Sequence, residues 1–210
     1  GLMEKLYPKS PFLEPARVTV AEALVETGKP DAARGVLEQF VATSPNDPRA
    51  QRAWGALARA RDAAGDRAGA VEAYTRALKD ANPADLRPEM AIGYARLLTQ
   101  DKRGSEARKV LDGLLRSDDK NIVASAAAGI GEAYQSEGEN IAAAEYFMTA
   151  AYVAPDTQAG RSGLLGAGAC LAALKQNDSA AIVYNKLIAQ KDVPADVLER
   201  ARKGLKDIGR

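Results

Sequence analysis

A repeat of 36 or 37 residues is the feature that most restricts how this chain can fold. Alanine recurs at that interval, at Ala33, Ala70, Ala107, Ala143 and Ala180. Four positions after each alanine stands a large side chain: Leu37, Tyr74, Leu111, Phe147 and Tyr184. Twelve positions before each alanine stands a small residue: Ala21, Ala58, Ala95, Gly131 and Gly168. Such regular spacing is typical of stacked, similar units, in which each unit packs mainly against its neighbours.

Each unit reads as two helices joined by a short turn. Apolar residues recur three and four positions apart between proline-containing breaks, which predicts amphipathic helices. The expected turns are TGKPD, AGDRA, DKRGS, EGENI and KQNDS. Their residue types end one helix and begin the next. A lone helical hairpin cannot bury its apolar face but stacked hairpins can, so the predicted fold is an all-α solenoid.

The repeat also predicts where the array begins and ends. Five units are expected over residues 14–193, at about 14–50, 51–87, 88–123, 124–160 and 161–193. Pro8 lies 37 residues before Pro45, so residues 1–13 are either the remnant of an upstream repeat or an N-terminal cap helix. Residues 194–210 have apolar residues at helical spacing and a charged opposite face, which predicts a C-terminal capping helix.

The fourth unit resembles the tetratricopeptide repeat. That family has the pattern W-x2-L-G-x2-Y, then A-x3-F, then P, usually in 34 residues. The matching residues here are Ile130, Gly131, Tyr134, Ala143, Phe147 and Pro155. The second unit supplies the first aromatic as Trp54 but has Arg61 in the tyrosine position. The resemblance covers about residues 14–192, and a Sel1-like array ranks second because its extra glycines are missing. The resemblance implies that the all-α solenoid is a right-handed superhelix.

The stretch SGLLGAGAC, residues 162–170, could be mistaken for an active site. Gly168 falls on the small-residue position of the repeat, so we interpret it as the place where two helices of one hairpin pack. A phosphate-binding loop would need a third glycine where Leu171 stands. Cys170 is expected to be a small, buried apolar residue, because the chain has no histidine to activate it.

Composition argues against several other functions. The absence of histidine removes the commonest general base and metal ligand. A single cysteine rules out a multi-cysteine metal site, and a net charge of +1 gives no general attraction to nucleic acid. No apolar run reaches the roughly 18–20 residues that span a bilayer. We therefore expect no enzyme activity, no catalytic or metal residues, no cofactor, no nucleic-acid partner and no membrane insertion.

The resemblance implies that the first helices of the units line a concave groove. The groove candidates are Glu22, Arg52, Arg59, Ile92, Arg96, Glu132, Leu165 and Ala169. This surface would be basic near the second and third units and apolar near the fifth, which suits a partner peptide or helix with an acidic centre. The alternative is that Glu22 with Arg59, and Arg96 with Glu132, form ordinary surface ion pairs of about 0–1 kcal/mol each.

The expected function is a non-enzymatic scaffold that binds another protein. The alternative is a docking or regulatory segment of a larger enzyme, exporter or transporter complex. The alanine-rich hairpins resemble those of tetratricopeptide repeat proteins of the bacterial cell envelope, which implies a role in envelope assembly or export and a periplasmic location. A cytoplasmic location is the alternative.

Overall fold

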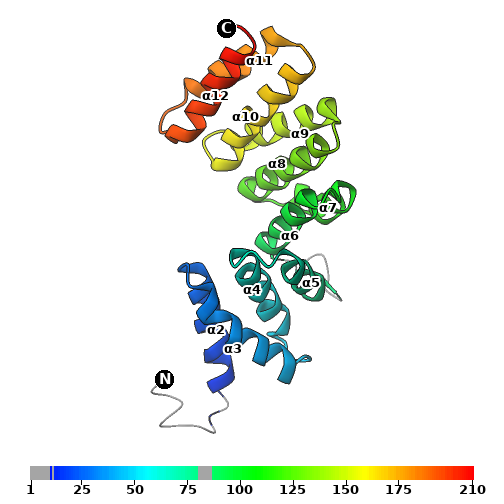
Figure 1. Cartoon of the computed structure of the whole chain (residues 1–210), viewed down its shortest axis with the longest axis vertical. Helices are drawn as coiled ribbons and strands as arrows, with labels where there is room; N and C mark the ends of the chain where they lie inside the picture. The colour runs from blue at the N-terminus through cyan, green and yellow to red at the C-terminus, as the bar shows by residue number, and fades with distance from the viewer. Residues whose placement is uncertain (1–9, 11, 80–86) are drawn as a thin grey trace. The chain divides into compact units, whose positions relative to one another are not determined.

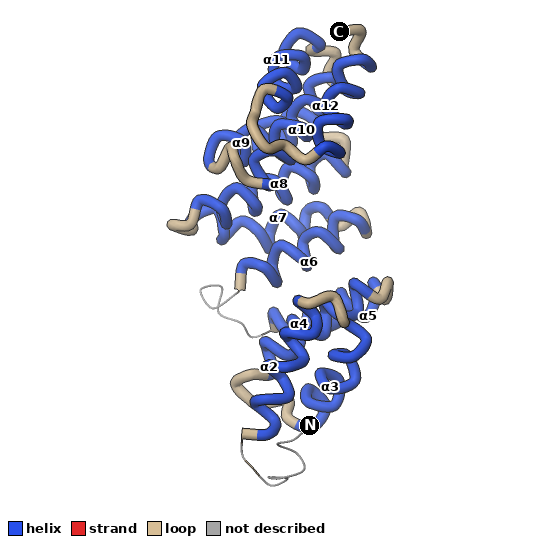
Figure 2. The backbone as a smooth tube through the Cα atoms, turned by 90° about the vertical axis from the view of Figure 1, so that its left-hand side faces the viewer, coloured by secondary structure: helices blue, strands red, loops and turns tan. Residues whose placement is uncertain are grey.

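The computed structural model describes residues 10, 12–79 and 87–210. Their regular elements are all helices (Figure 2). The predicted all-α solenoid class is therefore confirmed. The chain divides into two compact units, residues 1–90 and residues 91–210, which are described separately. Of the predicted N-terminal segment 1–13, residues 1–9 and 11 lie outside the described residues.

Unit 1 contains two helical hairpins (Figure 1). Its helices are α2 (Leu13–Glu26), α3 (Pro30–Thr43), α4 (Ala50–Ala63) and α5 (Arg67–Leu78). Each contacts the next, and α2 also contacts α4, so the first helices of the two hairpins are neighbours.

Unit 2 begins within α6 (Pro88–Gln100). The following elements are α7 (Gly104–Asp112), the 3-10 helix η2 (Gly113–Arg116), α8 (Lys120–Ser136), α9 (Asn140–Val153), α10 (Gln158–Ala173), α11 (Asn177–Ile188) and α12 (Ala195–Asp207). Helix α10 contacts both α8 and α12. The first helices of successive hairpins therefore form a row that α12 continues.

The turns inside the hairpins share one backbone geometry. Near the end of each first helix, a backbone carbonyl accepts a hydrogen bond from the amide five residues later. In the fourth turn, the amide of Glu139 donates to the carbonyl of Tyr134 at 3.0 Å. The equivalent donors are Lys29, Asp66, Arg103 and Gln176. One residue of each turn has a positive φ: Gly28, Gly65, Lys102, Gly138 and Lys175. This is the Schellman ending of a helix, which satisfies carbonyls that the helix leaves free.

The repeated positions form the core. All five alanines that define the repeat are fully buried. The large residues four positions later are at most 4% exposed. A buried alanine lets two helices approach closely, and the large residue fills the space between them. The periodic columns of the sequence are therefore packing positions.

The glycines of α10 allow it to contact two neighbouring helices closely. A Cβ atom on Gly168 would lie 2.5 Å from Cε1 of Tyr184, on α11 of the same hairpin. A Cβ on Gly166 would lie 2.7 Å from Cε2 of Phe147, on α9 of the preceding hairpin. Both distances are too short for real side chains. The packing interpretation of Gly168 is confirmed, and Gly166 has the same role toward the other neighbour.

Helix α12 follows the same packing rule as the preceding first helices. Gly129 packs against Leu111, Gly166 against Phe147 and Gly204 against Tyr184. In each case a glycine on a first helix faces the large residue of the preceding hairpin. Since α12 also contacts both α10 and α11, it lies where the first helix of a further unit would lie. Its inner face therefore extends the surface lined by α8 and α10.

Candidate functional site

Two adjoining hollows form the candidate site in unit 2. The first, of about 280 Å³, is lined by Ile92, Arg96, Ser125, Ala128, Gly129, Glu132, Gln158, Ala159 and Ser162. The second, of about 420 Å³, is lined by Glu132, Gln135, Phe147, Ser162, Leu165, Gly166, Ala169, Tyr184, Arg200, Lys203, Gly204 and Asp207. Glu132 and Ser162 belong to both linings. The two hollows therefore adjoin at these residues, and we call them together the unit 2 groove.

Five of the residues predicted to line a groove lie in the unit 2 groove. They are Ile92, Arg96, Glu132, Leu165 and Ala169. Arg96 influences Glu132 electrostatically: burial raises the pKa of the Glu132 carboxyl, and the Arg96 guanidinium opposes that rise. Both residues therefore line the same hollow, and the charge of Arg96 acts on Glu132 there. Their role in binding a partner remains a prediction.

Helix α12 also contributes to the groove, which the sequence pattern does not predict. Arg200, Lys203 and Asp207 line the second hollow, whereas the sequence predicts only a capping helix with a solvated charged face. A signal was present in the glycines. Gly93, Gly129, Gly166 and Gly204 are spaced by 36, 37 and 38 residues, which places the C-terminal helix in register with the first helices.

The other predicted groove residues lie in unit 1. Glu22, Arg52 and Arg59 line a hollow of about 380 Å³, together with Glu26, Gly55, Ala56, Arg87, Pro88, Glu89 and Met90. We call it the unit 1 hollow. Arg59 and Arg96 therefore line separate hollows, each within its own unit.

The predicted ion pair between Glu22 and Arg59 is wrong. Glu22 instead accepts two hydrogen bonds from Arg52, at 3.1 Å from Nε and 2.5 Å from Nη2. Arg59 approaches Glu26, with Nη1 at 3.9 Å from Oε1. The partner of Glu22 is therefore 30 residues away in the sequence, and not the 37 residues of the repeat. Glu22 is only 7% exposed, so its paired carboxylate is a poor contact for a ligand.

Comparison with known sequences identifies the family. Three models, each described as tetratricopeptide repeat, match residues 20–85, 63–130 and 124–157. Together they span residues 20–157 without a gap. The chain belongs to the tetratricopeptide repeat family. Members of this family are protein-interaction scaffolds, so the same general role applies to this repeat protein. A comparison with curated proteins finds no match.

Solved tetratricopeptide repeat structures share the fold. MamA from Desulfovibrio magneticus RS-1 is 18% identical, with 90% of this chain and 96% of that chain covered and a TM-score of 0.67. PilF of Pseudomonas aeruginosa is 16% identical, with 93% and 88% covered and a TM-score of 0.69. A repeat protein from Parabacteroides merdae is 18% identical, with 93% and 72% covered and a TM-score of 0.71. At these identities the likeness concerns the fold alone.

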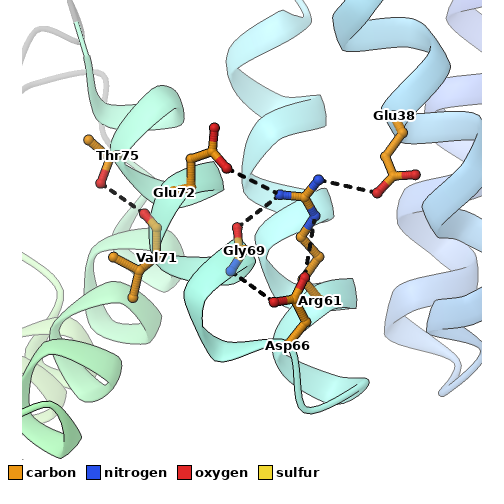
Figure 3. Close-up of polar contacts among 7 residues, drawn as sticks. All are labelled: Glu38, Arg61, Asp66, Gly69, Val71, Glu72 and Thr75. Atoms are coloured by element: carbon orange, nitrogen blue, oxygen red, sulfur yellow. Dashed lines mark hydrogen bonds and ion pairs between the residues drawn. The ribbon is translucent and has the colours of Figure 1, made fainter.

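One departure from the family pattern has a structural explanation. Arg61, in the tyrosine position of its repeat, donates from Nη1 to the carbonyl of Gly69 at 3.1 Å and from Nη2 to Glu38 at 3.2 Å (Figure 3). Asp66 and Glu72 lie 4.0 and 3.9 Å from its guanidinium. The side chain connects α3 of one hairpin with α5 of the next. An arginine therefore joins hairpins here through polar contacts.

The fourth tetratricopeptide unit keeps the tyrosine. Tyr134 is half-buried and stacks on Tyr146, with ring centroids 5.6 Å apart. Arg108, from α7, lies over the Tyr134 ring with its guanidinium carbon 4.2 Å from the ring centroid. Arg108 also pairs with Glu137. Tyr134 thus packs between hairpins, although it is not fully buried.

Cys170 is buried in the core of α10, as predicted. Its thiol accepts a hydrogen bond from Gln135 Nε2 at 3.4 Å, and burial raises the pKa of the thiol. A raised pKa keeps the sulfur protonated near neutral pH, which lowers its reactivity. Within residues 10, 12–79 and 87–210, no acidic, cysteine or histidine cluster suitable for a metal ion occurs. No helix among them is long and apolar enough to cross a bilayer.

Proposed function

We propose that this tetratricopeptide repeat protein binds an extended peptide or a helix of a partner protein in the unit 2 groove. The observation that carries the proposal is that the two hollows adjoin along α6, α8, α10 and α12. Ala169 is exposed beside the largely buried Leu165, and charged groups flank these two residues. Such grooves are typical sites for peptide segments, which gain affinity from apolar contacts and orientation from charges.

The charge balance favours the unit 2 groove over the unit 1 hollow. The unit 1 hollow is lined by three arginines and three glutamates: Arg52, Arg59, Arg87, Glu22, Glu26 and Glu89. The unit 2 groove is lined by three basic and two acidic residues: Arg96, Arg200, Lys203, Glu132 and Asp207. Its net positive charge matches a partner segment with acidic residues.

Charge reversal at Arg96 tests this function. The partner is first isolated with the full-length protein as bait. It is then titrated against the variants at low and moderate salt. Arg96→Glu is expected to weaken binding by about tenfold at low salt and to reduce its salt dependence, because it adds a negative charge beside Glu132. Lys186→Glu is the matched control, since Lys186 is exposed on α11 and outside the groove lining.

Two results would separate the possible outcomes. Equal affinities for Arg96→Glu and Lys186→Glu would contradict binding in the unit 2 groove. If Arg59→Glu alone weakened binding, the unit 1 hollow would be the contact surface. A docking segment of a larger enzyme or exporter complex would use the same groove. The other domains of the full-length chain would distinguish that alternative from a separate scaffold. They would also test the expected role in envelope assembly.

A further inference from the structure

The second hollow of the unit 2 groove has a basic edge formed by α12. Arg200 and Lys203 are one turn apart on this helix, and both line the hollow with exposed side chains. Neither forms an ion pair with another residue in the described part of the chain. Two adjacent cations without a carboxylate partner are available to bind an acidic group.

The apolar residues of the same hollow are largely buried. Leu165 and Phe147 belong to its lining but are only 7% and 2% exposed, and the Phe147 ring fills the space that a side chain on Gly166 would take. Ala169 is exposed at the edge and adds only a methyl group. The volume of about 420 Å³ lies within the range of sites that hold small ligands or single side chains.

The charges of the hollow are arranged asymmetrically. Glu132 lies on α8, whereas Arg200 and Lys203 lie on α12. On α12, Asp207 lies one turn beyond Lys203 and lines the same hollow, whereas Asp196 and Glu199, near Arg200, lie outside its lining. A carboxylate entering the hollow is repelled by Glu132 and attracted by the basic pair. The hollow therefore favours acidic groups on its α12 side.

We propose that this hollow anchors a partner segment in which one apolar side chain is flanked by acidic residues. The apolar side chain lies over Leu165 and Ala169, and the neighbouring carboxylates pair with Arg200 and Lys203. The inference rests on the proposed function, because it names the partner chemistry that the unit 2 groove selects. It also gives the C-terminal helix a role in binding, beyond covering the end of the array.

A defined peptide tests the proposal on the full-length protein. The probe is a fluorescein-labelled peptide in which one phenylalanine is flanked on each side by two glutamates, in a glycine–serine frame. Arg200→Glu with Lys203→Glu is expected to weaken its binding by at least about tenfold at low salt. The control, Arg202→Glu with Lys206→Glu, makes the same charge change on the same helix at exposed positions outside the hollow, and should stay within about twofold.

Further probes separate the apolar contact from the charges. Ala169→Trp is expected to block the hollow and weaken peptide binding by about tenfold without changing any charge. Changing the peptide phenylalanine to alanine, or its glutamates to glutamines, should each reduce affinity. Thermal melting of every variant establishes that it is folded, which is expected because the substituted residues are exposed.

The outcomes distinguish this inference from the proposed function. Equal binding by the two double variants, or no binding of the peptide to the unsubstituted protein, would overturn the inference. If Arg96→Glu still weakened binding of the isolated partner in either case, the groove function would stand and only the partner chemistry would be wrong. If Arg96→Glu also had no effect, both proposals would fail.

Discussion

Replacing Gly168 with leucine is expected to lower the free energy of unfolding by about 1–3 kcal/mol, the usual cost of overpacking a core. Even a Cβ at this position would lie 2.5 Å from Cε1 of Tyr184. That ring is only 4% exposed, and Gly204 of α12 also packs against it, so it has little room to move. Chemical denaturation followed by circular dichroism measures the change.

The neighbouring residue provides the control for this prediction. Ala169 is exposed on the same helix, so Ala169→Leu should change stability by no more than about 0.5 kcal/mol. Gly131→Leu should resemble Gly168→Leu, because a Cβ on Gly131 would lie 2.8 Å from Cδ1 of Phe147. A denaturation curve of Gly168→Leu identical to that of the unsubstituted protein would contradict the packing role.

Replacing Arg61 with leucine is expected to destabilise unit 1 by about 1–3 kcal/mol. The substitution leaves the carbonyl of Gly69 without its donor and Glu38 without its cation. The arginine side chain is 19% exposed, so water replaces these contacts only in part. Denaturation should show the loss, and hydrogen exchange should locate it in α3, α4 and α5.

A second arginine of the same unit gives the comparison. Arg76 is exposed on α5, so Arg76→Leu should alter stability by about 0.5 kcal/mol or less. A double-mutant cycle of Arg61→Leu with Glu38→Leu would measure the coupling across the hairpins directly. Equal stabilities of Arg61→Leu and Arg76→Leu would show that the contacts of Arg61 do not stabilise the fold.

The sequence could predict the fold because packing positions repeat. A buried alanine and a large residue four positions later recur in every unit, and periodic burial leaves a periodic pattern. The turns could also be predicted, although Lys102 and Lys175 adopt the positive φ that glycine has elsewhere. The Schellman hydrogen bonds form around lysine as well, so residue type alone underestimates how uniform these turns are.

The contacts of charged side chains could be predicted only in part. Aligning the repeats of this chain assumes that equivalent residues of successive hairpins lie next to each other in space. The proximity of Arg96 to Glu132 follows that assumption, whereas the bonding of Glu22 to Arg52 does not. Long side chains can contact residues that are not at equivalent positions of the repeat, and a repeat alignment does not predict such contacts. The basic edge of α12 was missed for a different reason, since only its glycine matches the repeat columns.

Site-specific photo-crosslinking tests most directly whether the protein acts through the unit 2 groove. A photoreactive amino acid replaces Ala169 in the groove or, as the control, Ile182 on α11, which is 70% exposed and outside the groove lining. The full-length protein is irradiated with its isolated partner, and the products are separated by mass. We expect a cross-linked complex from position 169 and little from position 182. Cross-linking from position 182 alone would contradict binding in the groove.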